Sequence, residues 1–61
     1  MHHYFVVSKS TDDITAVVQR TSQPQNLDDK KFVKADGLLL PIYYRLLSQK
    51  TVVTLQEVLN Y

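Results

Sequence analysis

The densest apolar segment of the chain covers residues 38–47 and reads LLLPIYYRLL. At the α-helical advance of about 100° per residue, its leucine, isoleucine and tyrosine side chains fill one broad arc. Pro41, Arg45, Ser48 and Gln49 fall in the narrower opposite arc. Proline suits the first turn of a helix, where its missing N–H would be unpaired anyway. The pattern therefore predicts extended chain up to about Leu40 and then a helix over residues 41–50.

A strand over residues 38–44 is the competing interpretation of this segment. Asp36-Gly37 would then be the turn of a hairpin whose first strand covers residues 32–35. Pro41 disfavours that version, because proline confines a strand to a sheet edge or a bulge.

A second helix is predicted over residues 54–61. Thr54 and Glu57 have the spacing of a capping box, in which each side chain satisfies a backbone N–H of the other residue. Leu55, Val58 and Leu59 follow at helical spacing and predict the inner face of this helix.

The first twenty residues predict a β-hairpin. Residues 4–8 are aromatic and β-branched, residues 10–13 are turn formers, and residues 14–20 provide a returning strand. In that strand we expect Ile14, Ala16 and Val18 to face the core. The alternative is a strand followed by a helix capped by Ser10 or Thr11.

The middle of the chain is less clearly patterned. Residues 21–26 are polar, contain Pro24 and predict a surface loop. Residues 27–36 fit either a short helix capped by Asn26 or a strand over 31–35. Gly37, the only glycine in the sequence, is expected to supply a positive φ angle.

These elements predict one small α+β domain over residues 1–61, with an N-terminal hairpin, or strand and helix, before two C-terminal helices. A chain of 61 residues buries about 60% of its unfolded surface and is marginally stable alone. The sequence contains no cysteine, so disulfides and thiolate zinc sites are excluded. We therefore expect a homodimer or a subunit of a complex.

We expect a cytoplasmic chain that is not inserted in a membrane. The absence of cysteine fits the cytoplasm. No segment reaches the roughly 18 apolar residues that a membrane span needs, and the N-terminal segment lacks the features of a signal peptide. The formal net charge is +1, which is too balanced to predict binding to nucleic acid by charge alone.

The sequence contains few side chains in positions suited to catalysis or to binding a cofactor. The acidic pairs Asp12-Asp13 and Asp28-Asp29 stand where caps and turns need these residue types. His2 and His3 are the only histidines, and neighbouring residues of a strand point in opposite directions. We expect no enzyme, no cofactor and no metal site.

Two binding functions remain open. The predicted helix pair at the C-terminus has the outline of a helix-turn-helix, in which Lys50, Gln56 and Asn60 would contact DNA. Few cations lie nearby to contact phosphates, which disfavours this regulator.

The preferred hypothesis is a non-enzymatic module that occupies the surface of a partner protein, as an inhibitor or adaptor. Four tyrosines are many for this length, and tyrosine suits interfaces. The expected contact residues are Tyr43, Tyr44, Arg45 and Leu47. A structural subunit of a larger assembly is a further alternative. Small cysteine-free chains are common among phage and mobile-element inhibitors, which is a general expectation rather than a property of these residues.

Overall fold

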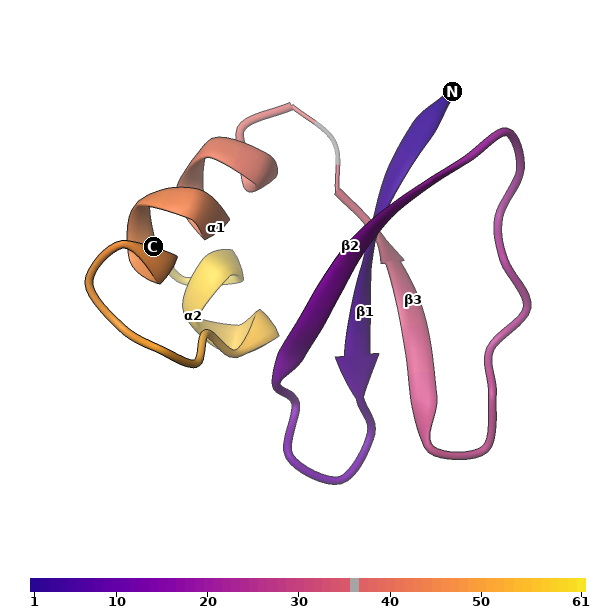
Figure 1. The fold of residues 1–61 in the computed structure, drawn as a ribbon, viewed down its shortest axis with the longest axis horizontal. Helices are drawn as coiled ribbons and strands as arrows, with labels where there is room; N and C mark the ends of the chain where they lie inside the picture. Colours follow the sequence, from indigo (N-terminus) through magenta and orange to yellow (C-terminus); the bar gives the residue numbers. More distant parts are fainter. Residues whose placement is uncertain (36) are drawn as a thin grey trace.

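A small antiparallel sheet followed by two helices makes up the molecule (Figure 1). The computed structural model describes residues 1–35 and 37–61, and within these residues the sheet has three strands in the order β2-β1-β3. The elements are β1 (His2–Ser8), β2 (Ile14–Arg20), β3 (Lys30–Lys34), α1 (Leu39–Leu47) and α2 (Leu55–Leu59). This arrangement confirms the predicted α+β fold and the N-terminal hairpin.

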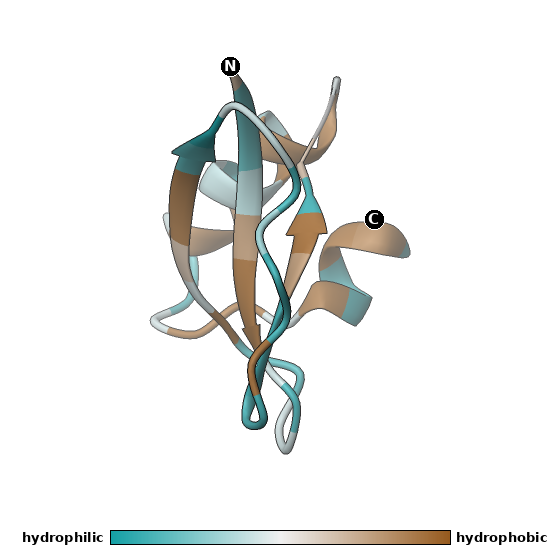
Figure 2. Cartoon of the chain, turned by 90° about the vertical axis from the view of Figure 1, so that its right-hand side faces the viewer, coloured by the Kyte–Doolittle hydropathy of each residue, from teal (hydrophilic) through white to brown (hydrophobic). Residues whose placement is uncertain are grey.

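The central strand β1 is buried on both faces. Phe5 and Val7 belong to the main core, whereas Tyr4 and Val6, of opposite parity, are buried on the other face. Figure 2 shows why both faces are covered: the helices lie behind the sheet, and the segment between β2 and β3 passes in front of it. Because the helices cover one face and the loop between β2 and β3 covers the other, apolar residues follow one another in this strand without alternating with polar ones.

A β-bulge shifts the faces of β2 from the predicted ones. Ala16 pairs with Val6, but Ile14 pairs with Val7, so Thr15 is an extra residue in the strand. The expectation that Ile14, Ala16 and Val18 face the core together is therefore wrong beyond Ile14. Ile14 is buried, Ala16 is exposed, and Val17 packs on the core in its place.

The third strand resolves the ambiguity of residues 27–36 in favour of a strand. β3 pairs antiparallel with β1, with Phe5 opposite Val33. Asp36, half of the predicted Asp36-Gly37 turn, lies outside the described residues. Gly37 has the expected positive φ, at 59°.

Polar side chains of the preceding loop occupy the outer edge of β3. The Asn26 Oδ1 accepts a hydrogen bond from the Phe32 N–H (2.9 Å), and the Gln23 amide donates to the Phe32 carbonyl (3.1 Å). The Leu27 N–H donates to the Lys30 carbonyl (2.9 Å). The loop predicted from residues 21–26 thus takes the place of a neighbouring strand.

Both predicted helices are present with different bounds. α1 begins at Leu39, earlier than expected, because Pro41 is tolerated anywhere in the first turn. It ends at Leu47, after which Ser48 donates back to the Tyr44 carbonyl. α2 is only five residues long, and its capping box between Thr54 and Glu57 is formed as predicted.

The core lies between the sheet and the helices. Tyr43 packs on Phe5 with ring centroids 5.2 Å apart. Leu55 and Val58 are buried as expected, whereas Leu59 points to solvent because α2 ends there. Among the described residues, the buried members of this core between sheet and helices are Phe5, Val7, Ile14, Ala35, Tyr43, Val53, Leu55 and Val58.

Candidate protein-binding groove

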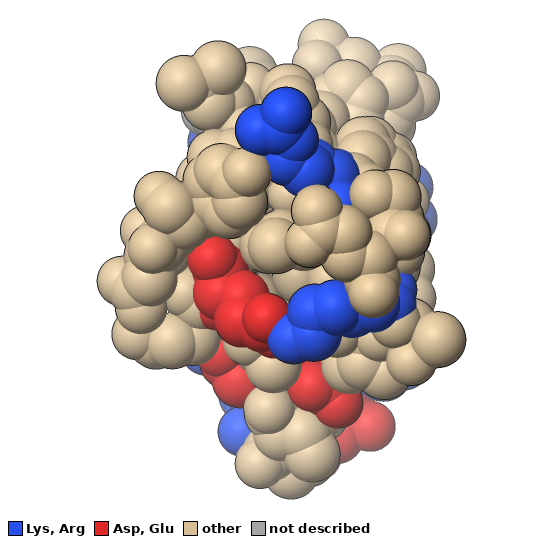
Figure 3. Space-filling model, turned by 90° about the vertical axis from the view of Figure 1, so that its left-hand side faces the viewer, with Lys and Arg blue, Asp and Glu red and all other residues tan. Residues whose placement is uncertain are grey.

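An open apolar groove runs along one flank of α1. It has a volume of about 570 Å³ and is lined by Leu38, Pro41, Ile42, Arg45 and Tyr61. Leu38 is 77% exposed and adjoins the other apolar side chains of the groove. Figure 3 shows the side of the molecule that carries the helices, where uncharged atoms predominate.

Helical spacing brings the lining residues of α1 together. Leu38, Pro41 and Ile42 are three and four residues apart, and Arg45 continues the same row, so all four lie on one flank. Ile42 also packs against the core, which ties this flank to the rest of the molecule.

The last residue of the described chain closes the groove from the other side. α2 directs the chain back toward α1, and the Arg45 Nη1 donates to the Tyr61 hydroxyl at 3.0 Å. The guanidinium has further donors than the one used here. The groove therefore offers apolar walls and one cation at its rim.

The four predicted contact residues are divided by the structure. Arg45 lies in the groove, whereas Tyr44 and Leu47 are exposed on the other flank of α1, with Tyr44 at 55%. The division follows from helix geometry, since residues one or two positions apart do not share a face. Tyr43 is a core residue, 6% exposed, and supports α1 from within.

Burial changes the ionisation of Tyr43. Its removal from water raises the pKa of the phenol above the usual 10.0, and the neighbouring Tyr44 adds to the effect. The ring centroids of these two tyrosines lie 5.3 Å apart. The exposed ring of Tyr44 therefore packs against the buried ring of Tyr43.

The residues proposed for DNA contact do not form a basic surface. Lys50 pairs with Glu57, and this contact, followed by the Thr54 N–H, holds the pKa of the Glu57 carboxyl below 4.5. Gln56 is exposed on α2, which is only five residues long, and Asn60 is exposed directly after the helix ends. A lysine already paired with a carboxylate is poorly placed to contact phosphate.

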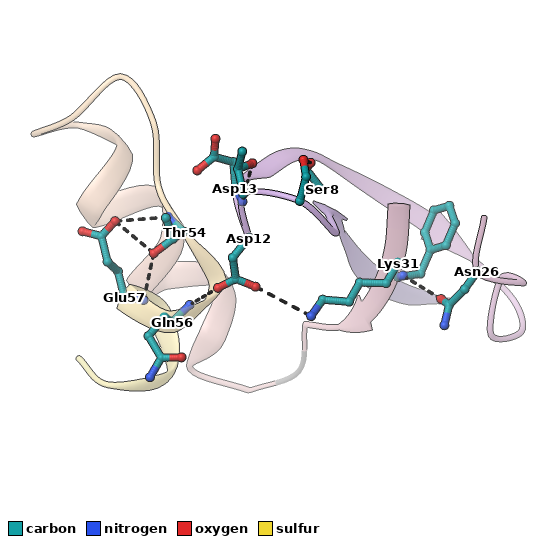
Figure 4. A network of polar contacts seen from close by, with 11 residues as sticks. Ser8, Asp12, Asp13, Asn26, Lys31, Thr54, Gln56 and Glu57 are labelled. Atoms are coloured by element: carbon teal, nitrogen blue, oxygen red, sulfur yellow. Dashed lines mark hydrogen bonds and ion pairs between the residues drawn. The ribbon is translucent and has the colours of Figure 1, made fainter. Parts of the chain in front are cut away.

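A carboxylate also occupies the N-terminus of α2. The Asp12 Oδ2 accepts from the Gln56 N–H at 3.1 Å, and its Oδ1 lies 3.6 Å from the Lys31 Nζ (Figure 4). The Asp12 carbonyl accepts from the Leu55 N–H at 2.9 Å. Negative charge at this point opposes the approach of a phosphate backbone, so the geometry disfavours the helix-turn-helix hypothesis.

The two histidines point apart along β1. The His3 Nε2 lies 2.8 Å from the Gln19 Nε2, whereas the His2 ring packs edge-on against Tyr4. Among residues 1–35 and 37–61, no group of three or more metal-ligating side chains is gathered in one place. In the same part of the chain, each helix is too short or too polar to cross a membrane.

Comparison with known proteins adds no relative. No protein-family model, no curated protein and no solved structure matches this chain.

Sequence reasoning missed the role of Tyr61 and Leu38 in the groove. Arg45 and Tyr61 are separated by 16 residues, so no local pattern connects them. The available signal for Leu38 was its place just before the helix, where a polar capping residue is more usual.

Proposed function

We propose that this chain is a non-enzymatic protein-binding module that acts by occupying the surface of a partner protein. The observation that carries the proposal is the groove along α1, which exposes leucine, isoleucine, proline and tyrosine around one arginine. Apolar side chains on the surface are normally scattered, and a contiguous set marks an interaction site.

The chemistry of the groove indicates the kind of segment that it binds. Its apolar walls fit one or two large apolar side chains of the partner, which would displace water from Leu38 and Ile42. Arg45 at the rim fits a carboxylate or a backbone carbonyl of the same segment, since a guanidinium can donate several hydrogen bonds. We therefore assign the partner contact to an apolar segment with an acidic neighbour.

Tyr44 and Leu47 extend the contact around α1. They are exposed on the flank opposite the groove and could meet a partner that surrounds the helix. A partner restricted to the groove would leave both residues in water. Substitution of Tyr44 by alanine separates these two binding modes.

A capture experiment with matched leucine variants tests the proposal. Tagged protein, Leu38→Asp and Leu27→Asp are used to capture partners from a lysate of the producing cells. Leu27 is 53% exposed and lies in the loop before β3, away from the groove, so it is the matched control. We expect a defined protein to be retained by the wild type and by Leu27→Asp, and to be lost from Leu38→Asp.

The salt dependence of capture distinguishes a protein partner from DNA. Burial of apolar surface depends weakly on salt, whereas phosphate contacts weaken steeply as salt rises. Retention of the same protein by the wild type and both variants, or a nuclease-sensitive complex that dissolves in salt, would contradict the proposal.

A further inference from the structure

The two outer edges of the sheet differ in how far other residues of the chain cover them. The edge of β3 is occupied by Gln23, Asn26 and Leu27, and the strand itself carries three lysines. Both are devices by which proteins keep a sheet edge from pairing with another strand. The edge of β2 carries no lysine, and another segment covers only its start.

Only the start of β2 is covered by another segment. The Ile14 N–H donates to the Val53 carbonyl at 2.8 Å, and Asp13 forms an isolated bridge with Thr54. Beyond this point β2 is the last strand in the order β2-β1-β3. In Figure 1, β2 begins beside β1 at the helix end of the sheet and crosses in front of it higher up.

Hydrogen-bond alternation identifies the backbone groups at this edge. The His3 carbonyl accepts from the Ala35 N–H, so the odd-numbered residues of β1 bond to the β3 side and Tyr4 and Val6 bond to β2. Their partners are Val18 and Ala16, which therefore point inward. Val17 and Gln19 consequently direct their N–H and carbonyl groups to the outer edge. The Gln19 carbonyl there accepts a hydrogen bond from the Arg20 Nη1 (2.7 Å), so pairing with another strand relies on the two Val17 groups and the Gln19 N–H.

The side chains of this edge suit pairing with an identical strand. Residues 15–19 read TAVVQ and contain no charge, no proline and no glycine. An antiparallel copy centred on Val17 would place Thr15 opposite Gln19 and Ala16 opposite Val18. It would also bring Arg20 of one copy to the end where Asp13 of the other lies. The Arg20 Nη1 donates to the Gln19 carbonyl of its own chain, but the guanidinium has further donors, so unlike charges can still meet there.

We propose that the open edge of β2 pairs with the β2 edge of a second copy of this chain. The two sheets would then join into one antiparallel sheet of six strands about a twofold axis. Val53 limits the pairing to the residues after Ile14, which fixes where the two strands can overlap. This surface is separate from the groove of α1, so a dimer leaves the groove of each copy available.

Proline substitution tests the edge without removing the hydrogen bonds to β1. The N–H of Gln19 points outward, so Gln19→Pro removes a donor to the second copy and keeps the ladder to β1. Gln19→Ala is the matched control, because it loses the same contact with His3 but retains the N–H. Circular dichroism checks that each variant is folded.

The readout is molar mass in solution by light scattering. We expect twice the monomer mass of 7.1 kDa for the wild type and Gln19→Ala, and the monomer mass for folded Gln19→Pro. A wild type that stays monomeric at millimolar concentration overturns the proposal, as does a Gln19→Pro protein that remains dimeric.

Hydrogen exchange of the wild type supplies a second test that requires no variant. The amides of Val17 and Gln19 are expected to be protected at high concentration and to lose that protection on dilution. Exchange at these amides that is fast at every concentration would overturn the proposal, even if Gln19→Pro does not fold.

Discussion

Substitution of Asp12 is the most informative change to the fold. This residue has a positive φ of 64°, a conformation that aspartate tolerates better than most residues. Its carboxylate also accepts a hydrogen bond from the Gln56 N–H at the start of α2. Asp12 therefore combines a backbone role in the hairpin turn with a side-chain role 44 residues away.

The two roles are separated by three variants. Loss of a capping side chain costs about 1 kcal/mol, and alanine in the left-handed region costs about 1 kcal/mol more. Asp12→Ala should therefore lower the free energy of unfolding by about 2 kcal/mol. Asp12→Gly loses the cap but relieves the backbone, so it should retain about 1 kcal/mol more than Asp12→Ala.

Asp12→Asn retains an acceptor oxygen and tolerance of positive φ, but loses the ion pair with Lys31. Both side chains of that pair are more than a third exposed, so solvent screening leaves it at most a few tenths of a kcal/mol. Asp12→Asn should thus be the most stable variant of the three.

Urea unfolding followed by circular dichroism measures these differences, provided that the slope with urea is unchanged. Equal losses for Asp12→Ala and Asp12→Gly would refute the backbone argument. A loss for Asp12→Asn as large as that for Asp12→Ala would show that charge, rather than the hydrogen bond to Gln56, holds α2.

Three further predictions concern ionisation and the single glycine. The folded pKa of Glu57 lies below 4.5, so the stability that its ionised carboxylate contributes is present above that value and is lost as the pH falls through the folded pKa. Unfolding of Glu57→Gln measured across acid pH should therefore lack this loss of stability. An acid profile identical to that of the wild type would contradict the pairing with Lys50. Burial raises the folded pKa of Tyr43, so the unfolded state ionises first and stability falls as the pH rises above about 10.0; Tyr43→Phe should flatten the alkaline limb of the unfolding curve, whereas Tyr44→Phe should leave it. Gly37→Ala has free space for the added methyl group but must keep φ near 59°, so it should lower the free energy of unfolding by about 1 kcal/mol, as measured by urea unfolding. No loss of stability would mean that the backbone leaves this conformation in the variant.

Local signals in the sequence were sufficient for the elements that are stabilised locally. The capping box of Thr54 and Glu57 joins residues three positions apart and could be identified directly. The hairpin followed from two β-branched segments on either side of a short turn. The helix at residues 39–47 was located by its apolar arc, although its first residue depended on how early Pro41 sits.

Features that depend on distant contacts were not predictable in the same way. β3 carries lysines and becomes a strand by pairing with β1, more than twenty residues earlier. The extra residue Thr15 reverses the faces of β2, and a period of two cannot reveal it. The division of Tyr44 and Leu47 from Arg45 depends on which side of α1 meets the core.

The most direct test of the proposed function is photo-cross-linking from the groove itself. Benzoylphenylalanine replaces Tyr61 in one protein and Leu27 in another, and each is irradiated in a lysate of the producing cells. The proposal predicts that position 61 forms a covalent adduct with one partner protein, that Leu38→Asp abolishes it, and that position 27 forms none. A groove probe that yields no adduct, while the probe at position 27 captures the partner, would contradict the assignment of function to the groove along α1.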